Sequence, residues 1–183
     1  MLIDITRTMH NGMKVWPGDT PFKRETKQFG DFTSSSVTMS LHTGTHMDAP
    51  RHRFECGKSI DEIFPVIVPA LVKKQGNPTG RAVLLDRPVT ALQAEELVKK
   101  GIVLIGTTSM SIDYGESLEA HAVLLGAGIP VIENLELDSV PPGNYIVMAF
   151  PLKFSEADGS PVRVILAENP QDIYSFPQEG RDD

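Results

Sequence analysis

The sequence contains a single cysteine and no long apolar run. Cys56 cannot form an internal disulfide bond, which agrees with a reducing compartment. No apolar stretch approaches the ~20 residues that cross a bilayer. The N-terminus also lacks the basic and then apolar layout of a signal peptide. We therefore expect a cytoplasmic protein without a membrane-spanning segment.

Positive charge is also scarce. The chain has 17 Lys and Arg residues against 24 Asp and Glu, a formal net charge of −7, which disfavours nucleic acid or an anionic membrane as the main partner. A small-molecule substrate fits this charge better. The 183 residues, 40% hydrophobic and 22% charged, match an ordinary globular chain, and no linker, repeat or low-complexity segment interrupts them. We expect one domain over residues 1–183.

Short apolar runs rich in Val and Ile alternate with helical patterns. The runs predict strands of a largely buried sheet at residues 2–5, 66–72, 82–85, 102–105, 131–132, 145–150 and 162–166. Thr90 and Gln93 form a capping box that opens a helix, which Gly101 stops. A second helix is expected from Ser117, as N-cap, to Gly126. The interleaving predicts an α/β domain. The polar tail 177–183 is expected to fray or to dock on a partner subunit.

The most informative segment reads HTGTHMDAPRH over residues 42–52. His42, His46, Asp48 and His52 follow spacings of four, two and four, and three of the chain's five histidines lie here. Neutral imidazole with carboxylate is a ligand set that suits Zn, Mn, Fe or Ni. The alternative is a polar strand face whose histidines bond to neighbouring backbone. Four such residues together favour a metal site.

The residues before this segment suggest where the site lies. Residues 36–42 alternate polar and apolar side chains, which predicts a half-buried strand with His42 on its polar face. Gly44 and Pro50 make a helix through the segment improbable. We expect the site at a strand end that runs into a loop.

A second pair of candidate ligands lies further along the chain. His121 falls on the apolar face of the second helix, and Glu133 ends an apolar run that predicts a core strand. Taken singly, His121 could be a hydrogen-bonded core histidine and Glu133 a salt-bridged strand end. With four ligands upstream, a buried carboxylate and imidazole are better explained by a metal. Six ligands exceed the need of one tetrahedral ion, and Asp48 is the natural bridge between two.

These motifs resemble the metal-dependent cyclase family, which includes the bacterial kynurenine formamidases (arylformamidases). The likeness is carried by residues 42–52 and by VWPGDTP at 15–21, SLEAH at 117–121, residues 129–133 and DGSPVR at 158–163. It implies a swivelling β/β/α-type domain with a mixed, largely buried sheet, in a homodimer or homotetramer.

The resemblance also implies roles for individual residues. The centre would hold one or two divalent ions, with Zn favoured over Mn. His42, His46 and Asp48 would hold the first ion, and Asp48, His121 and Glu133 the second. His52 would be the acid–base residue. Trp16 would stack on the substrate; its alternative role is a core or interface anchor.

The expected activity is hydrolysis of a formamide or related amide, with an aryl formamide such as N-formylkynurenine favoured, as in tryptophan catabolism. A metal lowers the pKa of water and polarises a carbonyl, while His52 moves the proton to the leaving nitrogen. Enzymatic alternatives are an isatin-type cyclic imide hydrolase and a lactone hydrolase. The non-enzymatic alternative is a ligand-binding oligomer stabilised by its metal. Cys56 is expected to be a bystander thiol, with a nucleophile as the alternative.

Overall fold

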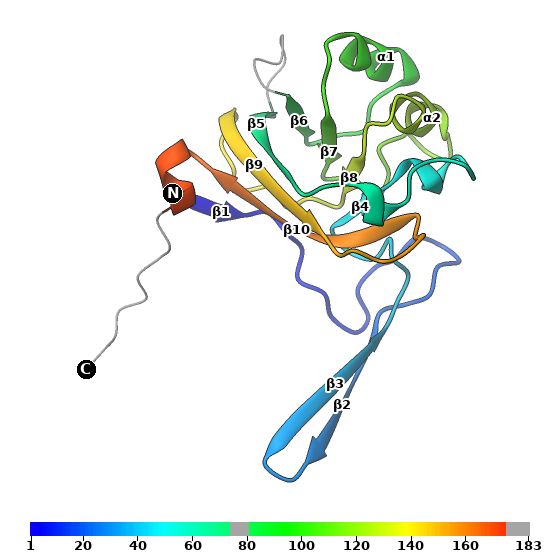
Figure 1. Ribbon diagram of the computed structural model, residues 1–183, viewed down its shortest axis with the longest axis vertical. Coiled ribbons are helices and arrows are strands. Elements are labelled where there is room, and N and C mark those ends of the chain that lie inside the picture. Colours follow the sequence, from blue (N-terminus) through cyan, green and yellow to red (C-terminus); the bar gives the residue numbers. More distant parts are fainter. Residues whose placement is uncertain (74–80, 175–183) are drawn as a thin grey trace.

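The structure is a computed structural model that describes residues 1–73 and 81–174. Its centre is an eight-stranded sheet with the order β1-β10-β4-β8-β7-β6-β5-β9 (Figure 1). The strands of this sheet are β1 (Leu2–Asp4), β4 (His46–Asp48), β5 (Val66–Val72), β6 (Ala82–Leu85), β7 (Leu104–Thr107), β8 (Val131–Glu133), β9 (Gly143–Pro151) and β10 (Gly159–Ala167). A further pairing joins β9, at one end of the order, to β10, next to the other end, so seven strands close into a barrel-like ring with β1 added to β10.

The sheet is mixed, and neighbouring strands change from parallel to antiparallel at β4 and β8, where the predicted site lies. The neighbours from β5 to β8 run parallel, whereas β4 runs antiparallel to both β8 and β10. Strands β6, β7 and β8 are almost wholly buried, as expected for parallel strands covered on both faces, whereas β5 is buried only over its last three residues. The seven predicted strands are all present. β7 begins two residues later than predicted, because Ile102 and Val103 belong to the turn that leads into it.

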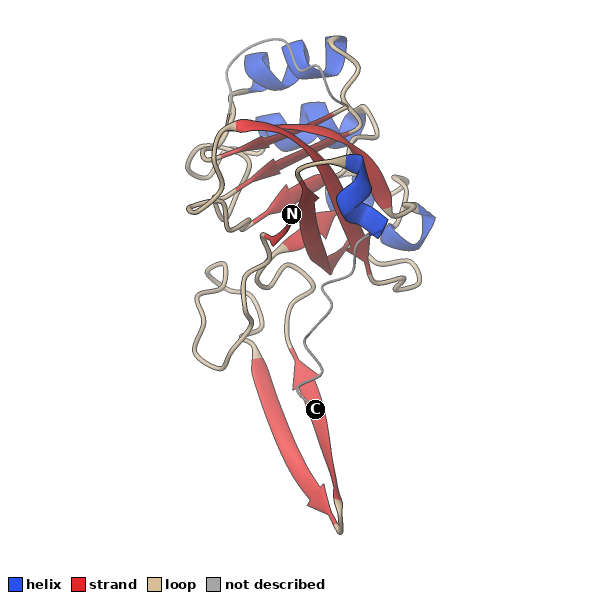
Figure 2. Ribbon diagram, turned by 90° about the vertical axis from the view of Figure 1, so that its left-hand side faces the viewer, coloured by secondary structure: helices blue, strands red, loops and turns tan. Residues whose placement is uncertain are grey.

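Two helices cover one outer face of the ring (Figure 2). Helix α1 (Ala91–Lys99) begins with the predicted capping box of Thr90 and Gln93. Helix α2 (Glu119–Gly126) begins one residue later than predicted, with Leu118 rather than Ser117 as N-cap. Ser117 still accepts a hydrogen bond from the Glu119 amide at 3.2 Å.

Two hydrophobic cores hold these layers together. The larger core fills the ring, and the smaller one lies between the sheet and the two helices. Leu124 and Leu125 bind α2 to the sheet through the smaller core, opposite Ile105 and Val131 on β7 and β8. Burial of each such side chain contributes about 1.5–3 kcal/mol. Helix α2 is therefore held rigidly over the parallel strands.

A two-stranded hairpin projects from the body (Figures 1 and 2). It pairs β2 (Lys23–Phe29) with β3 (Phe32–Thr38), and every residue of both strands is exposed. The prediction of a half-buried strand over residues 36–42 is therefore wrong. The alternation does form a strand, but its partner is only β2, so neither face meets a core. The strand ends at Thr38, and His42 lies in the turn that follows.

Short 3-10 helices complete the described chain: η1 (Pro50–His52), η2 (Ile60–Glu62) and η3 (Pro170–Tyr174). Within residues 1–73 and 81–174, no helix has the length and apolar character needed to cross a membrane. The tail 177–183, expected to fray or to dock on a subunit, lies outside the described residues.

Candidate metal centre

Six side chains from five separate elements meet at one side of the sheet. The turn after β3 supplies His42, β4 supplies His46 and Asp48, and the end of η1 supplies His52. Helix α2 and the end of β8 supply the remaining two, His121 and Glu133. The structure therefore brings all six candidate ligands together.

The register of two short strands places the buried part of this cluster. In the antiparallel pair β4–β8, His46 is the direct partner of Glu133. Asp48 lies two residues after His46 and so projects from the same face of the sheet. His46 Nε2 lies 3.4 Å from Asp48 Oδ1 and 3.4 Å from Glu133 Oε2. These three residues are at most 4% exposed.

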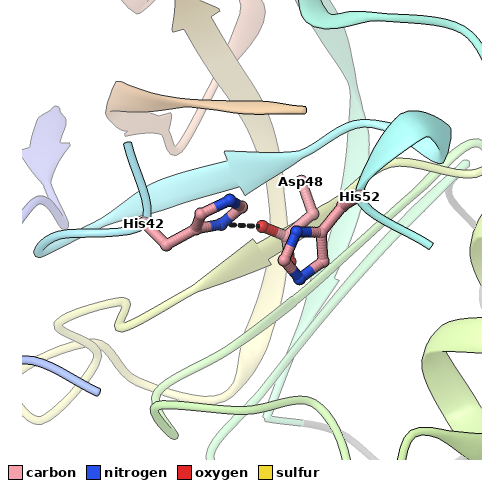
Figure 3. Close-up of side chains that lie close together, drawn as sticks. All are labelled: His42, Asp48 and His52. Atoms are coloured by element: carbon pink, nitrogen blue, oxygen red, sulfur yellow. Dashed lines mark hydrogen bonds and ion pairs between the residues drawn. The ribbon is translucent and has the colours of Figure 1, made fainter. Parts of the chain in front are cut away.

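His42 and His52 form the more open side of the cluster (Figure 3). His42 Nδ1 lies 2.7 Å from Asp48 Oδ1, and the rings of His42 and His52 lie 4.2 Å apart. Both rings also contact Asp158, whose Oδ2 lies 2.9 Å from His42 Nε2 and 3.1 Å from His52 Nδ1. One carboxylate therefore holds both imidazoles at the turn before β10.

His121 reaches the cluster from helix α2. Its Nε2 lies 3.2 Å from Glu133 Oε1 and 3.4 Å from Asp48 Oδ2. Its Nδ1 lies 2.6 Å from Asp113 Oδ2, in the loop between β7 and α2. Glu133 Oε1 also accepts a hydrogen bond from the Ile112 amide at 2.7 Å.

Sequence reasoning did not identify Asp113 or Asp158 as part of this centre. Asp158 stands in the DGSPVR segment that carried part of the resemblance, so a carboxylate next to a glycine turn was the available signal. Asp113 had no such signal, because its partners lie seven and eight residues away on a helix.

The donor set fits a divalent cation. Asp48 Oδ2 is buried and has no hydrogen-bond partner among the described residues, which a cation would supply. Two overlapping groups place their ligand atoms within 4.8 Å of one another: His42, Asp48 and His52, and His46, Asp48 and Glu133. Asp48 is common to both. This grouping sets His42 beside His52, whereas the family resemblance implied a shared ion for His42 and His46.

Opposite charges dominate the electrostatics of the cluster. Burial alone lowers the pKa of His42, but the carboxylates of Asp158 and Asp48 outweigh it and raise that pKa to about 9. Burial also opposes the charge of His121, yet Asp48 and Glu133 raise its pKa to about 10. The pKa of His46 likewise lies well above its ordinary value, despite burial. Without a cation His42, His46 and His121 are therefore protonated at neutral pH, and metal uptake must release those protons.

The same balance acts on the carboxylates. Burial raises the pKa of Asp48, but the charge of His46 and the contacts with the histidines hold it well below its usual range. The contacts with His42 and His52 lower the pKa of Asp158 strongly. Both carboxylates are thus ionised at neutral pH and available to a cation or a histidine.

A cavity of about 500 Å³ opens onto the cluster. Five residues of the cluster line it, together with apolar and polar side chains from other segments: His42, His46, His52, His121 and Glu133. The apolar side chains include Trp16, Met110 and Leu118, with Trp16 41% exposed. Cys56 is exposed and does not line this cavity. The volume is sufficient for a small aromatic molecule.

Known proteins resemble this chain over most of its length. A family model described as "Putative cyclase" matches residues 3–108. The kynurenine formamidase of Bacillus cytotoxicus is 36% identical, with 90% of this chain and 96% of that protein covered. The kynurenine formamidase of Paracidovorax citrulli is 35% identical, with 91% and 96% covered.

Solved structures agree with the fold. A protein from Bacillus stearothermophilus described as a "predicted metal-dependent hydrolase" superposes with a TM-score of 0.75 at 28% identity, over 91% of this chain and 97% of that one. Isatin hydrolase A from Labrenzia aggregata gives a TM-score of 0.77 at 23% identity, over 91% and 93%, which shows a shared fold. With the family model matching more than half of its length and relatives matching nearly all of it, this chain belongs to the cyclase family.

Proposed function

We propose that this protein is a metal-dependent hydrolase that cleaves the C–N bond of a formamide or a related amide, with an aryl formamide such as N-formylkynurenine as the favoured substrate. The observation that carries the proposal is the cluster of imidazoles and carboxylates around Asp48, onto which a cavity of about 500 Å³ opens. The relatives named kynurenine formamidase support the amide as substrate class.

The residues that would hold the metal follow from the grouping of the ligand atoms. His46, Asp48 and Glu133 would hold one ion, and Asp48 with His42 would face a second. His121 would join the first set, because its Nε2 contacts both Asp48 and Glu133. Zn is favoured and Mn is the alternative, because both accept imidazole with carboxylate. A bound divalent ion supplies Lewis acidity, which lowers the pKa of water and polarises a carbonyl.

His52 is proposed as the acid–base residue. Its side chain lines the cavity and is 34% exposed, so it can meet both solvent and substrate. Asp158 fixes Nδ1 of the ring, which leaves Nε2 to accept a proton from the attacking water and to return it to the leaving nitrogen. The proximity of His52 to His42 and Asp48 supports a second role, as a metal ligand. Metal content in a His52 variant separates the two roles.

Trp16 is proposed to bind the aromatic part of the substrate. It lines the cavity with Met110 and Leu118, and a large ring stacks favourably on an indole face. The remaining exposed fraction of Trp16, 41%, also suits the alternative role of an interface anchor.

We further propose that the chain acts as one domain over residues 1–183 in a homodimer or homotetramer, in the cytoplasm and in tryptophan catabolism. The hairpin β2–β3 supports an oligomer. A two-stranded ribbon is marginal in water unless another surface packs against it. This hairpin exposes Phe29 and Phe32, which stack on each other with their centroids 5.7 Å apart. A second copy of the chain would cover that apolar tip.

A substrate panel tests the reaction. Protein loaded with Zn or with Mn is assayed with formyl-arylamines, with isatin and other cyclic imides, and with lactones. Fastest turnover of the formyl-arylamines supports the proposal. Turnover restricted to cyclic imides or to lactones would assign the rival ring-opening activity. A loaded protein that binds these molecules but turns over none would support the non-catalytic metal-stabilised oligomer.

A further inference from the structure

One carboxylate outside the proposed ligand set contacts both a ligand and the helix that carries it. Asp113 is 4% exposed and lies in the loop between β7 and α2. Its Oδ1 accepts a hydrogen bond from the Ala120 amide at 2.6 Å, and its Oδ2 accepts one from the His121 amide at 3.1 Å. Asp113 therefore caps the first turn of α2, which its own N-cap residue Leu118 cannot do.

The same Asp113 oxygen also meets the ring of His121. Asp113 Oδ2 lies 2.6 Å from His121 Nδ1, while His121 Nε2 faces Asp48 and Glu133. Both Asp113 oxygens already accept from backbone amides, so the carboxylate also acts as the acceptor toward the ring and Nδ1 carries the proton. The other nitrogen, Nε2, is thereby left as the one that can donate its lone pair to a cation.

The loop that holds Asp113 also orients a second ligand. The amide of Ile112, the residue before it, donates to Glu133 Oε1 at 2.7 Å. The Ile112 carbonyl accepts from the Val89 amide at 2.8 Å, and the Ser109 carbonyl accepts from the Asn134 amide at 2.9 Å. The loop is thus tied to the fold at two points just before Asp113. The loop's Ile112 amide orients the Glu133 carboxylate, and its Asp113 carboxylate orients the His121 ring.

We propose that Asp113 is a positioning residue, which selects the Nδ1-protonated form of the His121 ring and presents Nε2 to the cation. The inference rests on the proposed metal centre. It adds a residue that contacts neither metal nor substrate and acts only through His121 and the start of α2.

Asp113→Asn is the sharpest variant, because it keeps the size of the side chain. The amide has one acceptor oxygen and one NH₂ group, so its NH₂ group must face either the Ala120 amide or the His121 amide and ring, in place of an oxygen that accepts there now. If the oxygen keeps the helix cap, the NH₂ group faces Nδ1 and favours the wrong form of the ring, as when the aspartate of a catalytic triad is replaced by asparagine. Loss of an indirect partner of this kind typically costs about 10–100-fold in metal affinity.

The experiment measures zinc affinity by competition with a chromophoric chelator and the protonation of the His121 ring by ¹⁵N NMR of zinc-loaded protein. We expect a wild-type ring with Nδ1 protonated and a 10–100-fold weaker zinc affinity in Asp113→Asn. Thr90→Ala is the matched control, since it removes the cap of α1 far from the centre. That control is expected to lower stability and to leave zinc affinity unchanged.

The possible results separate this inference from the proposed function. Wild-type zinc affinity in Asp113→Asn, or a wild-type His121 ring that is not protonated at Nδ1, overturns the role of Asp113. If Asp113→Asn does not fold, the NMR spectrum of the wild-type protein still decides. A wild-type protein that takes up no cation overturns the metal centre itself.

Discussion

His46 and Glu133 are direct partners across β4 and β8, although 87 residues separate them in the chain. Paired residues of an antiparallel ladder project from the same face, so their side chains must meet. His46 Nε2 and Glu133 Oε2 lie 3.4 Å apart as a result. The backbone ladder alone thus joins the two distant halves of the proposed metal centre.

Replacing Glu133 by Ala is expected to reduce metal uptake. Loss of even an indirect partner of a ligand costs about 10–100-fold in affinity, so loss of the proposed ligand should cost at least as much. Metal content after dialysis against a weak chelator measures this effect. Glu136→Ala is the matched control, because Glu136 is exposed three residues further along. Equal metal content in the two variants would remove Glu133 from the ligand set.

His52→Ala is expected to lower kcat on an aryl formamide by roughly 10² or more, with metal content nearly intact. The reason is that a general acid–base residue moves protons without holding the cation. Elemental analysis and steady-state kinetics on the same preparation check both parts. His10→Ala serves as the control, because His10 is exposed and does not line the main cavity. A parallel loss of metal would instead make His52 a ligand.

Gly159→Ala is expected to disturb His42. A Cβ at residue 159 would lie 2.7 Å from His42 Cε1 and 3.0 Å from the Met47 carbonyl oxygen, closer than real contacts allow. Relief requires His42 to move, at a cost of about 1–3 kcal/mol in the free energy of unfolding. Urea unfolding and metal affinity should both show the change. In Gly143→Ala, where the added Cβ meets Tyr145 at 3.4 Å, the metal affinity should stay that of the wild type.

The chelator-treated protein is expected to lose stability as the pH rises above neutrality. Folded pKa values of about 9 for His42 and about 10 for His121 exceed the ordinary value of 6.5. Their contribution is therefore full below pH 6.5 and is lost as the pH rises to about 10. Asp48, whose pKa is lowered, contributes above its ordinary value of 3.8 and loses that contribution in acid.

Urea unfolding over this pH range, with and without zinc, measures the effect. A cation replaces the protons on the imidazoles, so zinc should flatten the decline between pH 6.5 and about 10. A metal-free protein whose stability is constant over that range would contradict the balance of charges described for the cluster.

The hairpin tip is expected to hold subunits together. Replacing both Phe29 and Phe32 by Ser should weaken association about tenfold or more, because buried aromatic residues contribute most at interfaces. Light scattering at several protein concentrations measures the mass of the assembly. Phe64→Ser is the control, since Phe64 is 87% exposed outside the hairpin. A monomeric wild-type protein would end the proposal of an oligomer.

Much of the fold was predictable because its strands and α1 carry local signals. The Val and Ile runs of β5 and β6 match the structure residue for residue, and Thr90 with Gln93 caps α1 as expected. The hairpin was missed because residues 36–42 were predicted to form a half-buried strand, whereas β3 covers Phe32–Thr38 and is exposed. Alternation reports a strand but not whether a core faces it.

In the candidate centre too, the residues close in sequence were predictable and those joined only by tertiary contacts were not. His42, His46, Asp48 and His52 lie close in sequence, so their spacing alone pointed to a common site. Asp113 and Asp158 act through tertiary contacts with His121, His42 and His52, which no local spacing encodes. The grouping of His42 with His52 likewise depends on how η1 folds back toward the turn after β3.

The place of β10 in the ring sets an order for assembly at the ribosome. This strand pairs with β4 through residues 159–161 and follows directly after Asp158. During synthesis, the histidines of residues 42–52 emerge more than a hundred residues before the carboxylate that clamps two of them. Until residues 158–161 are made and pair with β4, His42 and His52 lack their contacts with Asp158. The contacts of Asp158 with His42 and His52 can therefore form only after nearly the whole polypeptide has been made.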